Sequence, residues 1–269
     1  MDQQPESKFR LSWFNCVELP RDNRNVIDGP GFRPFLGRRN FRSKGKNFIS
    51  TVPGVWSGRG HHVGSGPEYR VFIVLEGMPW HASIREQYPF AKPRAIQQIK
   101  AGMKVKRVNV MTIDFVLTLR PERPLGNFVY QGLSQKLKVQ RDKPRHQLRA
   151  EREVEALDEV GWAWDYAPAV TNVEVWNHEL LRQYAFAAPL DSAAPFAAEL
   201  ARMFYRTSSD KPLRSLLKMF MKRLGVQDDG FFLFAAAYYF GFIGLNHNER
   251  LDEDAPVALV EPFRSYELR

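Results

Sequence analysis

The strongest constraint on the fold comes from residues 108–137, which predict a β-hairpin. Two strand-like stretches, VNVMTIDFVLTL at 108–119 and NFVYQGLSQKL at 127–137, flank RPERPLGN, a stretch of proline, glycine and charged residues that is typical of a turn. The chain also has helix-like patterns before and after this hairpin. We therefore expect an α/β (α+β) architecture in which a mixed sheet is flanked by helices.

Two helices are predicted around the hairpin. GPEYRVFIVLEG at 66–77 has Pro67 in its first turn, where the missing N–H costs nothing, and apolar residues at helical spacing. HQLRAEREVEALDEVG at 146–161 is a charged amphipathic helix. WHASIREQYPF at 80–90 resembles a short strand and a turn, and PRAIQQIKAG at 93–102 a short basic helix.

After about residue 170 the composition becomes helical and acidic. Apolar residues recur at positions i, i+3, i+4 and i+7 in ELLRQYAFA, SAAPFAAELARMFYRTSS and PLRSLLKMFMKRLGV. The most apolar run, GFFLFAAAYYFGFIGL at 230–245, has 16 residues and falls short of the roughly 20 needed to cross a bilayer. It predicts a buried core helix and no membrane partner. With a strand at APVALVEPF, these helices outline a mostly helical, winged-helix-like module.

The two parts of the chain carry opposite charge. Residues 1–152 hold 28 lysines and arginines and 12 acidic residues, a net charge of +16, whereas residues 153–269 hold 11 and 18, a net charge of −7. This division favours two domains with different partners, because a basic surface suits a polyanion and an acidic one does not. We expect a basic domain at 1–168 and an acidic, helical interaction domain at 169–269.

A basic segment at residues 33–62 carries seven lysines and arginines and no acidic residue, with aromatic residues interleaved. This pattern suits contact with nucleic-acid phosphates, although a charge run can also be merely solvated surface. His61 and His62 at its end could contact DNA or bind a metal, but we interpret them as a surface pair. The cations of the segment that we assign to DNA contact are Arg38, Arg39, Arg42, Lys44 and Lys46.

Cysteine content and the first residues indicate the compartment. Cys16 is the only cysteine, so no intramolecular disulfide can form, and MDQQPESKFR lacks the apolar core of a signal peptide. The default expectation is a cytoplasmic protein.

Three ionisable side chains can carry hydrolytic chemistry. Glu68 lies on a predicted helix, Asp114 follows an apolar run in a predicted strand, and the paired strand runs into a lysine cluster. Phosphodiester hydrolysis needs carboxylates that hold one or two divalent ions, and a cation or base near the attacking water. Restriction-endonuclease-like folds meet that need with a helix glutamate, a strand aspartate and a lysine, although the spacing alone is common in unrelated proteins.

Three segments resemble the TnsA endonuclease subunit of heteromeric cut-and-paste transposases. They are SGPEYRVFIVLEGMPWHASIREQYPF at 65–90, VMTIDFVL at 110–117 and PRHQLRAEREVEALDEVGWAW at 144–164. The likeness covers most of residues 55–165, and the combination of IREQ with MTIDF is its most specific part. The resemblance implies a restriction-endonuclease-like fold and a DNA endonuclease that uses one or two Mg²⁺ or Mn²⁺ ions.

The resemblance also implies a role for each matching residue. Glu68, in SGPE, and Asp114, in MTIDF, would be metal ligands together with the backbone carbonyl of Gln135. The third element of the family is Gln-x-Lys on the paired strand, and here the sequence departs from the pattern. Counting backward from PRHQLRAE places the lysine at Lys136 and puts Ser134 in the position of the glutamine, whereas counting forward from the aspartate reaches no lysine.

Strand alternation would put Ser134, Lys136 and Lys138 on one face, and we assign Lys138 to phosphate contact. Ser134 is counted as a catalytic residue because its hydroxyl can hydrogen-bond a metal-bound water, but it reaches less far than a glutamine. This predicts cleavage that is slower, more dependent on partners, or lost.

Each assignment has a simpler interpretation. Glu68 can be a helix N-terminal carboxylate that the helix dipole favours, Asp114 one half of a structural ion pair, and Lys136 a solvated cation at a strand end. The adjacent residues Arg85, Glu86 and Gln87 are interpreted as structural residues or as residues that support the site, because such a run of polar types usually braces a turn.

The resemblance implies a bacterial subunit that acts at the nucleoid and cuts the 5′ strands at transposon ends. A TnsB-like transposase subunit would cut and join the 3′ strands, and the acidic domain would contact that subunit and a TnsC-like ATPase regulator. Two alternatives stay open: a non-catalytic DNA-binding adaptor of the same complex, and a stand-alone restriction or repair nuclease of the same fold.

Overall fold

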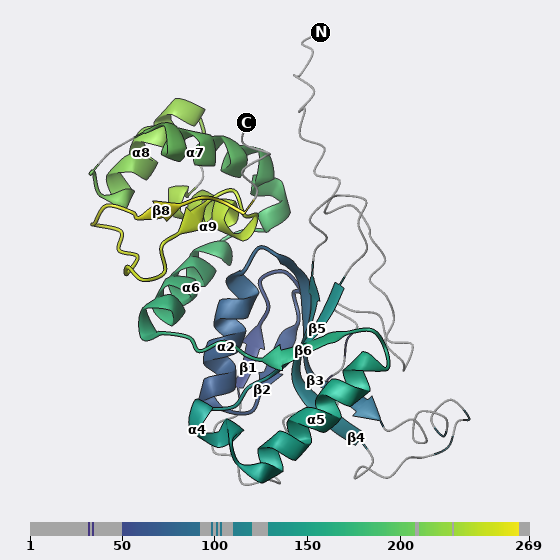
Figure 1. Cartoon of the computed structure of the whole chain (residues 1–269). Coiled ribbons are helices and arrows are strands. Elements are labelled where there is room, and N and C mark those ends of the chain that lie inside the picture. The colour runs from purple at the N-terminus through teal and green to yellow at the C-terminus, as the bar shows by residue number, and fades with distance from the viewer. Residues whose placement is uncertain are drawn as a thin grey trace. The chain divides into compact units, whose positions relative to one another are not determined.

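The computed structural model describes residues 32, 34, 50–91, 98, 101, 103, 110–119, 129–207, 210–227 and 229–263 (Figure 1). The basic residues 38–46, almost all of the predicted helix at 93–102, and the hairpin turn at 120–127 lie outside this part. The described residues form two compact units, which we call the sheet unit (residues up to Glu76, and His81–Ala169) and the helical unit (Gly77–Trp80, and from Val170 on). The division into two domains at 1–168 and 169–269 stays a prediction.

The sheet unit contains a four-stranded mixed sheet in the order β3 (His81–Ala91), β4 (Val110–Leu119), β5 (Val129–Ser134) and β6 (Ala163–Tyr166). The pairs β3–β4 and β4–β5 are antiparallel, and β5–β6 is parallel. The predicted hairpin is therefore confirmed as β4 and β5. The short strand and turn predicted at 80–90 are wrong, because β3 is one continuous strand of 11 residues.

Two longer helices of the sheet unit flank the sheet, α2 (Gly66–Gly77) and α5 (Pro144–Asp158), and both were predicted (Figure 1). α5 provides the crossover that the parallel pair β5–β6 requires. It packs closely on β5, because a Cβ atom at Gly132 would lie 2.4 Å from Cδ1 of the fully buried Leu157. The absence of a side chain at Gly132 thus sets how near α5 comes to the strand that leads into the candidate site.

The strand β5 is shorter than predicted. It ends at Ser134, residues 135–137 have no regular structure, and the single turn α4 (Lys138–Arg141) follows. The prediction that Lys136 and Lys138 share a strand face with Ser134 is therefore wrong.

The helical unit contains α6 (Asn172–Ala185), the 3₁₀ helix η3 (Leu190–Ala193), α7 (Ala194–Arg206), α8 (Leu213–Leu224) and α9 (Gly230–Tyr239). Two short antiparallel strands, β7 (Gly244–Leu245) and β8 (Leu259–Val260), complete it. All residues from Phe232 to Tyr239 are buried, so α9 is the centre of this unit.

The apolar run at 230–245 is buried as predicted, but only its first part is helical. Gly241 follows α9 with a φ of 78°, a left-handed conformation that glycine adopts without strain, and β7 begins three residues later. Among the described residues, no helix is both long enough and apolar enough to span a membrane.

A polar cluster lies inside the helical unit. The rings of His178 and His247 are stacked with their centroids 4.5 Å apart, and the hydroxyl oxygen of Tyr238 lies 2.9 Å from Nε2 of His247. Burial lowers the pKa of both histidines, and for His178 the neighbouring His247 lowers it further, to well below its usual value. Both imidazoles are therefore neutral in the folded protein at neutral pH.

We predict that the helical unit loses stability on mild acidification. A histidine with a lowered folded pKa binds protons more readily in the unfolded chain, so stability is full above about pH 6.5 and decreases below it. Protonation of His178 in the unfolded chain should lower the free energy of unfolding by about 1 kcal/mol between neutral pH and about pH 5.5. Urea unfolding of the wild type at the two pH values measures this loss. A His178→Asn, His247→Asn double variant with the same pH dependence as the wild type would contradict the prediction.

Candidate active site

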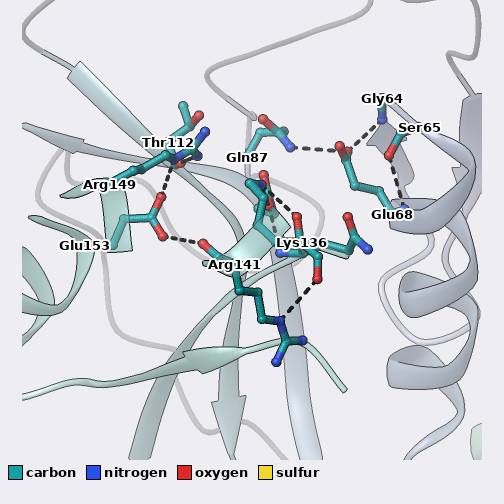
Figure 2. Close-up of polar contacts among 12 residues, drawn as sticks. Gly64, Ser65, Glu68, Gln87, Thr112, Lys136, Arg141, Arg149 and Glu153 are labelled. Atoms are coloured by element: carbon teal, nitrogen blue, oxygen red, sulfur yellow. Dashed lines mark hydrogen bonds and ion pairs between the residues drawn. The ribbon is translucent and has the colours of Figure 1, made fainter. Parts of the chain in front are cut away.

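Glu68 lies in the first turn of α2 and is buried, with 6% of its surface exposed. Its Oε2 accepts a hydrogen bond of 2.9 Å from the backbone N–H of Gly64, and its own N–H donates to Oγ of Ser65. The Nε2 of Gln87 donates to the same Oε2 at 3.4 Å (Figure 2). The carboxylate is therefore not only placed at the N-terminus of α2, because it also accepts a hydrogen bond from Gln87 of the sheet.

Gln87 has an unusual backbone conformation for a strand. Its φ is 48°, and it is the one non-glycine residue with positive φ in the described ranges. The register of β3 pairs Glu86 with Phe115 and Tyr88 with Ile113, so Gln87 lies opposite Asp114. A left-handed non-glycine residue costs of order 1–3 kcal/mol, and such residues gather at functional sites. Gln87 thus links the carboxylate of Glu68 to the position beside Asp114.

Asp114 occupies the middle of β4 and is 6% exposed. Its Oδ2 accepts a hydrogen bond of 2.8 Å from the N–H of Gln135 and lies 3.3 Å from Nζ of Lys136. The same ammonium donates to the carbonyl oxygen of Gln135 at 2.7 Å. The ammonium of Lys136 therefore bridges two of the three oxygen donors that were predicted as metal ligands.

Arg141 holds the irregular segment that carries Lys136. Its Nε donates to the carbonyl of Lys136 at 3.3 Å (Figure 2). Its Nη2 donates to the carbonyl of Ala167 at 3.2 Å. Its guanidinium also lies 4.3 Å from the ring centroid of Tyr166. Lys138, by contrast, is exposed at the start of α4, and its assignment to phosphate contact stays a prediction.

The side chain of Ser134 is directed to α5. Ser134 is buried, and its hydroxyl donates to Oε2 of Glu153. In this structure the hydroxyl is thus engaged with a carboxylate that the sequence reasoning did not consider, and a catalytic role for Ser134 stays a prediction.

Glu153 and Arg149 form a network that the sequence reasoning missed. Arg149 donates from Nε to Oε1 of Glu153 at 2.6 Å and from Nη2 to the carbonyl of Thr112 at 2.8 Å (Figure 2). Burial would lower the pKa of Arg149, but the charges of Glu153, Asp114 and Glu68 outweigh it and raise the pKa. The guanidinium is therefore in the field of both predicted metal ligands. The available signal was the i, i+4 spacing of Arg149 and Glu153 on an amphipathic helix.

A buried ion cluster lies beside the site, next to Gln87 in β3. Glu86 is fully buried and accepts hydrogen bonds from Nη1 and Nη2 of Arg59 at 2.8 and 2.6 Å, and its Oε2 lies 3.0 Å from Nδ1 of His61. Burial would raise the pKa of Glu86, but the bonds from Arg59 and His61 lower it to about 2. This cluster ties the hairpin of β1 (Ser50–Pro53) and β2 (Gly60–Val63) to β3.

The prediction of a surface pair is wrong for His61, which is 2% exposed and belongs to this cluster. The turn expected at Arg85, Glu86 and Gln87 is also wrong, because all three lie inside β3. Glu86 and Gln87 do bind neighbouring side chains, which agrees with the supporting role expected of them.

The donors at the site suit a hard divalent ion. Two carboxylates and a backbone carbonyl are the oxygen ligands that Mg²⁺ prefers in proteins. The ammonium of Lys136 already lies on two of these oxygens, so the site accommodates a cation. No group of three or more His, Cys, Asp or Glu side chains is arranged to hold a metal in the part of the chain that the structure describes. Any ion here would depend on the two carboxylates and the carbonyl.

The comparisons with known proteins do not identify a family: no family model matches this chain, and no curated protein matches it either. The resemblance to TnsA subunits therefore stays a hypothesis that rests on the quoted segments.

We predict that Glu86→Gln lowers the free energy of unfolding of the sheet unit by about 3 kcal/mol, because it leaves the buried charge of Arg59 without its carboxylate. In the wild type, the lowered pKa means that the contribution of Glu86 is full above about pH 4.5 and is lost as the pH falls towards 2. Urea unfolding at neutral and acidic pH measures both effects. The exposed Glu159 provides the control Glu159→Gln, and equal stabilities of the two variants at neutral pH would refute the prediction.

Proposed function

We propose that this protein is a Mg²⁺- or Mn²⁺-dependent DNA endonuclease with a restriction-endonuclease-like sheet unit. The observation that carries the proposal is the convergence of Asp114, Lys136 and the carbonyl of Gln135, with Glu68 linked to the same place through Gln87. A helix carboxylate, a strand carboxylate and a lysine on the next strand's end are the parts that such folds use. The four-stranded mixed sheet flanked by α2 and α5 is compatible with that class.

Glu68, Asp114 and the carbonyl of Gln135 would hold the metal, which when bound polarises a phosphate oxygen and lowers the pKa of a water. Lys136 is held at hydrogen-bond distance from Asp114 and Gln135, so its ammonium stands where it can orient the attacking water and stabilise negative charge that develops on the phosphate. When an ion takes these oxygens, Lys136 must release them, and its flexible stem allows that movement.

The biological reaction that we propose is cleavage of the 5′ strands at transposon ends, together with a TnsB-like transposase subunit that processes the 3′ strands. This part rests on the resemblance of residues 55–165 to TnsA subunits. The helical unit, with α6–α9 and the short pair β7–β8, would be the winged-helix-like module that contacts the TnsB-like subunit and a TnsC-like ATPase. We place the reaction in the bacterial cytoplasm, at the nucleoid.

A second candidate function is a non-catalytic DNA-binding adaptor. The ion pair between Lys136 and Asp114 favours it, because a lysine that permanently neutralises the aspartate leaves no room for a metal. The hydroxyl of Ser134, which donates to Glu153, is also consistent with a site that no longer cleaves.

We predict that Asp114→Asn and Lys136→Ala each reduce strand cleavage of end-containing DNA by at least about a hundredfold. The assay measures nicking in Mg²⁺ or Mn²⁺ with the transposase and ATPase partners present. Lys143→Ala is the matched control, because it removes a nearby exposed lysine to which no DNA contact is assigned, and it should cut within a few-fold of the wild type. Cleavage by Asp114→Asn at the wild-type rate would show that the site is wrong, and an active Lys136→Ala with an inactive Lys138→Ala would show that the lysine is misassigned.

The same assay separates the alternatives. Robust cleavage by the purified protein without partners would favour a stand-alone nuclease. No binding of Mg²⁺ or Mn²⁺ by calorimetry, together with undiminished function of Asp114→Ala, would favour the adaptor.

A further inference from the structure

We propose that Arg149 is a phosphate-binding residue of this site, whose guanidinium takes a non-bridging oxygen of a DNA phosphodiester next to Asp114. The proposal rests on the proposed function, because it assigns the DNA backbone as the ligand. Neither the charge pattern nor the quoted resemblance assigns a role to this residue.

Arg149 lies close to the predicted metal ligands. Its Nη2 donates to the carbonyl of Thr112, which is two residues from Asp114 on β4. The pairing of β5 with β4 ends at Leu133 and Phe115, before it reaches Thr112. The early end of β5 places Lys136 in an irregular segment and leaves the carbonyl of Thr112 to Arg149 of α5. The raised pKa of Arg149, to which Asp114 and Glu68 both contribute, agrees with this placement.

The guanidinium is held in one orientation without any ligand. Its Nε bonds to Glu153, which is 1% exposed and accepts two further hydrogen bonds, from the hydroxyl of Ser134 and from Nε1 of Trp164 at 3.0 Å. Glu153 is thus a positioning residue with three donors on one carboxylate. A cation that is fixed in advance loses little conformational freedom when an anion binds.

Part of the guanidinium remains available to an anion. The contacts that the described residues make to Arg149 use Nε and Nη2, and 41% of its side chain is exposed. Nη1 takes part in neither of these contacts, so the guanidinium keeps donor capacity that the ion pair with Glu153 does not use. The planar fork of a guanidinium matches two oxygens of a carboxylate or of a phosphate. The proposed DNA substrate makes the phosphodiester the anion that we assign to it.

Other cations surround the same place. The positive charges of Lys136, Lys143 and Arg145 all act on His146, which lies one turn before Arg149 on α5. The pKa of His146 is lowered by desolvation and by the charges of Arg145, Lys136, Arg149 and Lys143. A phosphate that approaches the two carboxylates therefore meets compensating positive charge, and Arg149 and Lys136 are cations that hydrogen bonds hold in place.

The test is equilibrium binding of a short fluorescein-labelled duplex, measured by anisotropy without divalent metal, so that it does not depend on cleavage. Arg149→Ala should bind about tenfold more weakly than the wild type, because a hydrogen bond between two charged groups is lost, and the slope of log affinity against log salt should fall by about 1. Arg152→Ala is the matched control, because it removes the same charge from an exposed position on the same helix. It should bind within about twofold of the wild type.

A second measurement separates phosphate contact from support of the fold. Arg149→Lys keeps the charge but not the fork and should recover part of the affinity, and melting curves show whether each variant is folded. A methylphosphonate removes the negative charge of a single phosphate. In a set of duplexes that each carry one methylphosphonate, the substitution at one position should weaken binding by the wild type. The same substitution should not weaken binding by Arg149→Ala any further.

Each outcome decides the proposal. The proposal is overturned if Arg149→Ala and Arg152→Ala lose equal DNA affinity, or if folded Arg149→Ala keeps the full affinity of the wild type. It is also overturned if no methylphosphonate position depends on Arg149, or if the wild type binds free inorganic phosphate as tightly as DNA. A wild type that binds DNA through Arg149 but never cuts it with its partners would refute the proposed endonuclease and leave the phosphate contact standing.

Discussion

The structure of the site depends on the hydrogen bonds and the positive charge that stabilise one buried carboxylate. Asp114 lies in the middle of the sheet, where an unpaired charge would be strongly unfavourable. The chain satisfies it by turning the N–H of Gln135 and the ammonium of Lys136 towards Oδ2. Because this N–H serves a side chain rather than a strand, β5 ends at Ser134, and the lysine, the adjacent carbonyl and the start of α4 take their positions from that ending.

Two elements complete the site from opposite directions. On one side, the left-handed conformation of Gln87 brings its amide to Glu68 and so links α2 to the sheet. On the other side, α5 brings Arg149 and Glu153 against the sheet. The missing side chain at Gly132 allows this helix to pack close to β5. The strain at Gln87 and the burial of the Glu153 carboxylate on α5 both cost free energy. Both lie near Asp114, which agrees with the binding or catalytic site that we propose there.

Much of the fold could be predicted from local pattern. The hairpin of β4 and β5, the helices α2 and α5, and the burial of the run at 230–245 all follow from periodicity and from glycine and proline positions, which act over a few residues. The length of β3, the early end of β5 and the end of α9 did not follow. Each depends on a partner distant in sequence: β4 for β3, Asp114 for β5, and for α9 the strand β8, which pairs with β7.

The sequence by itself determined which residue types could form the candidate site, because Glu68, Asp114 and Lys136 stand at positions that helix and strand patterns place in one layered unit. Only the tertiary structure decided which side chains meet. It joined Lys136 to Asp114 through an irregular segment rather than a strand face, directed Ser134 to Glu153, buried His61 against Glu86, and brought in Arg149 from α5. The reason is physical: periodicity reports the environment of a side chain, whereas the pairing of buried charges is settled by distances between segments that only folding brings together.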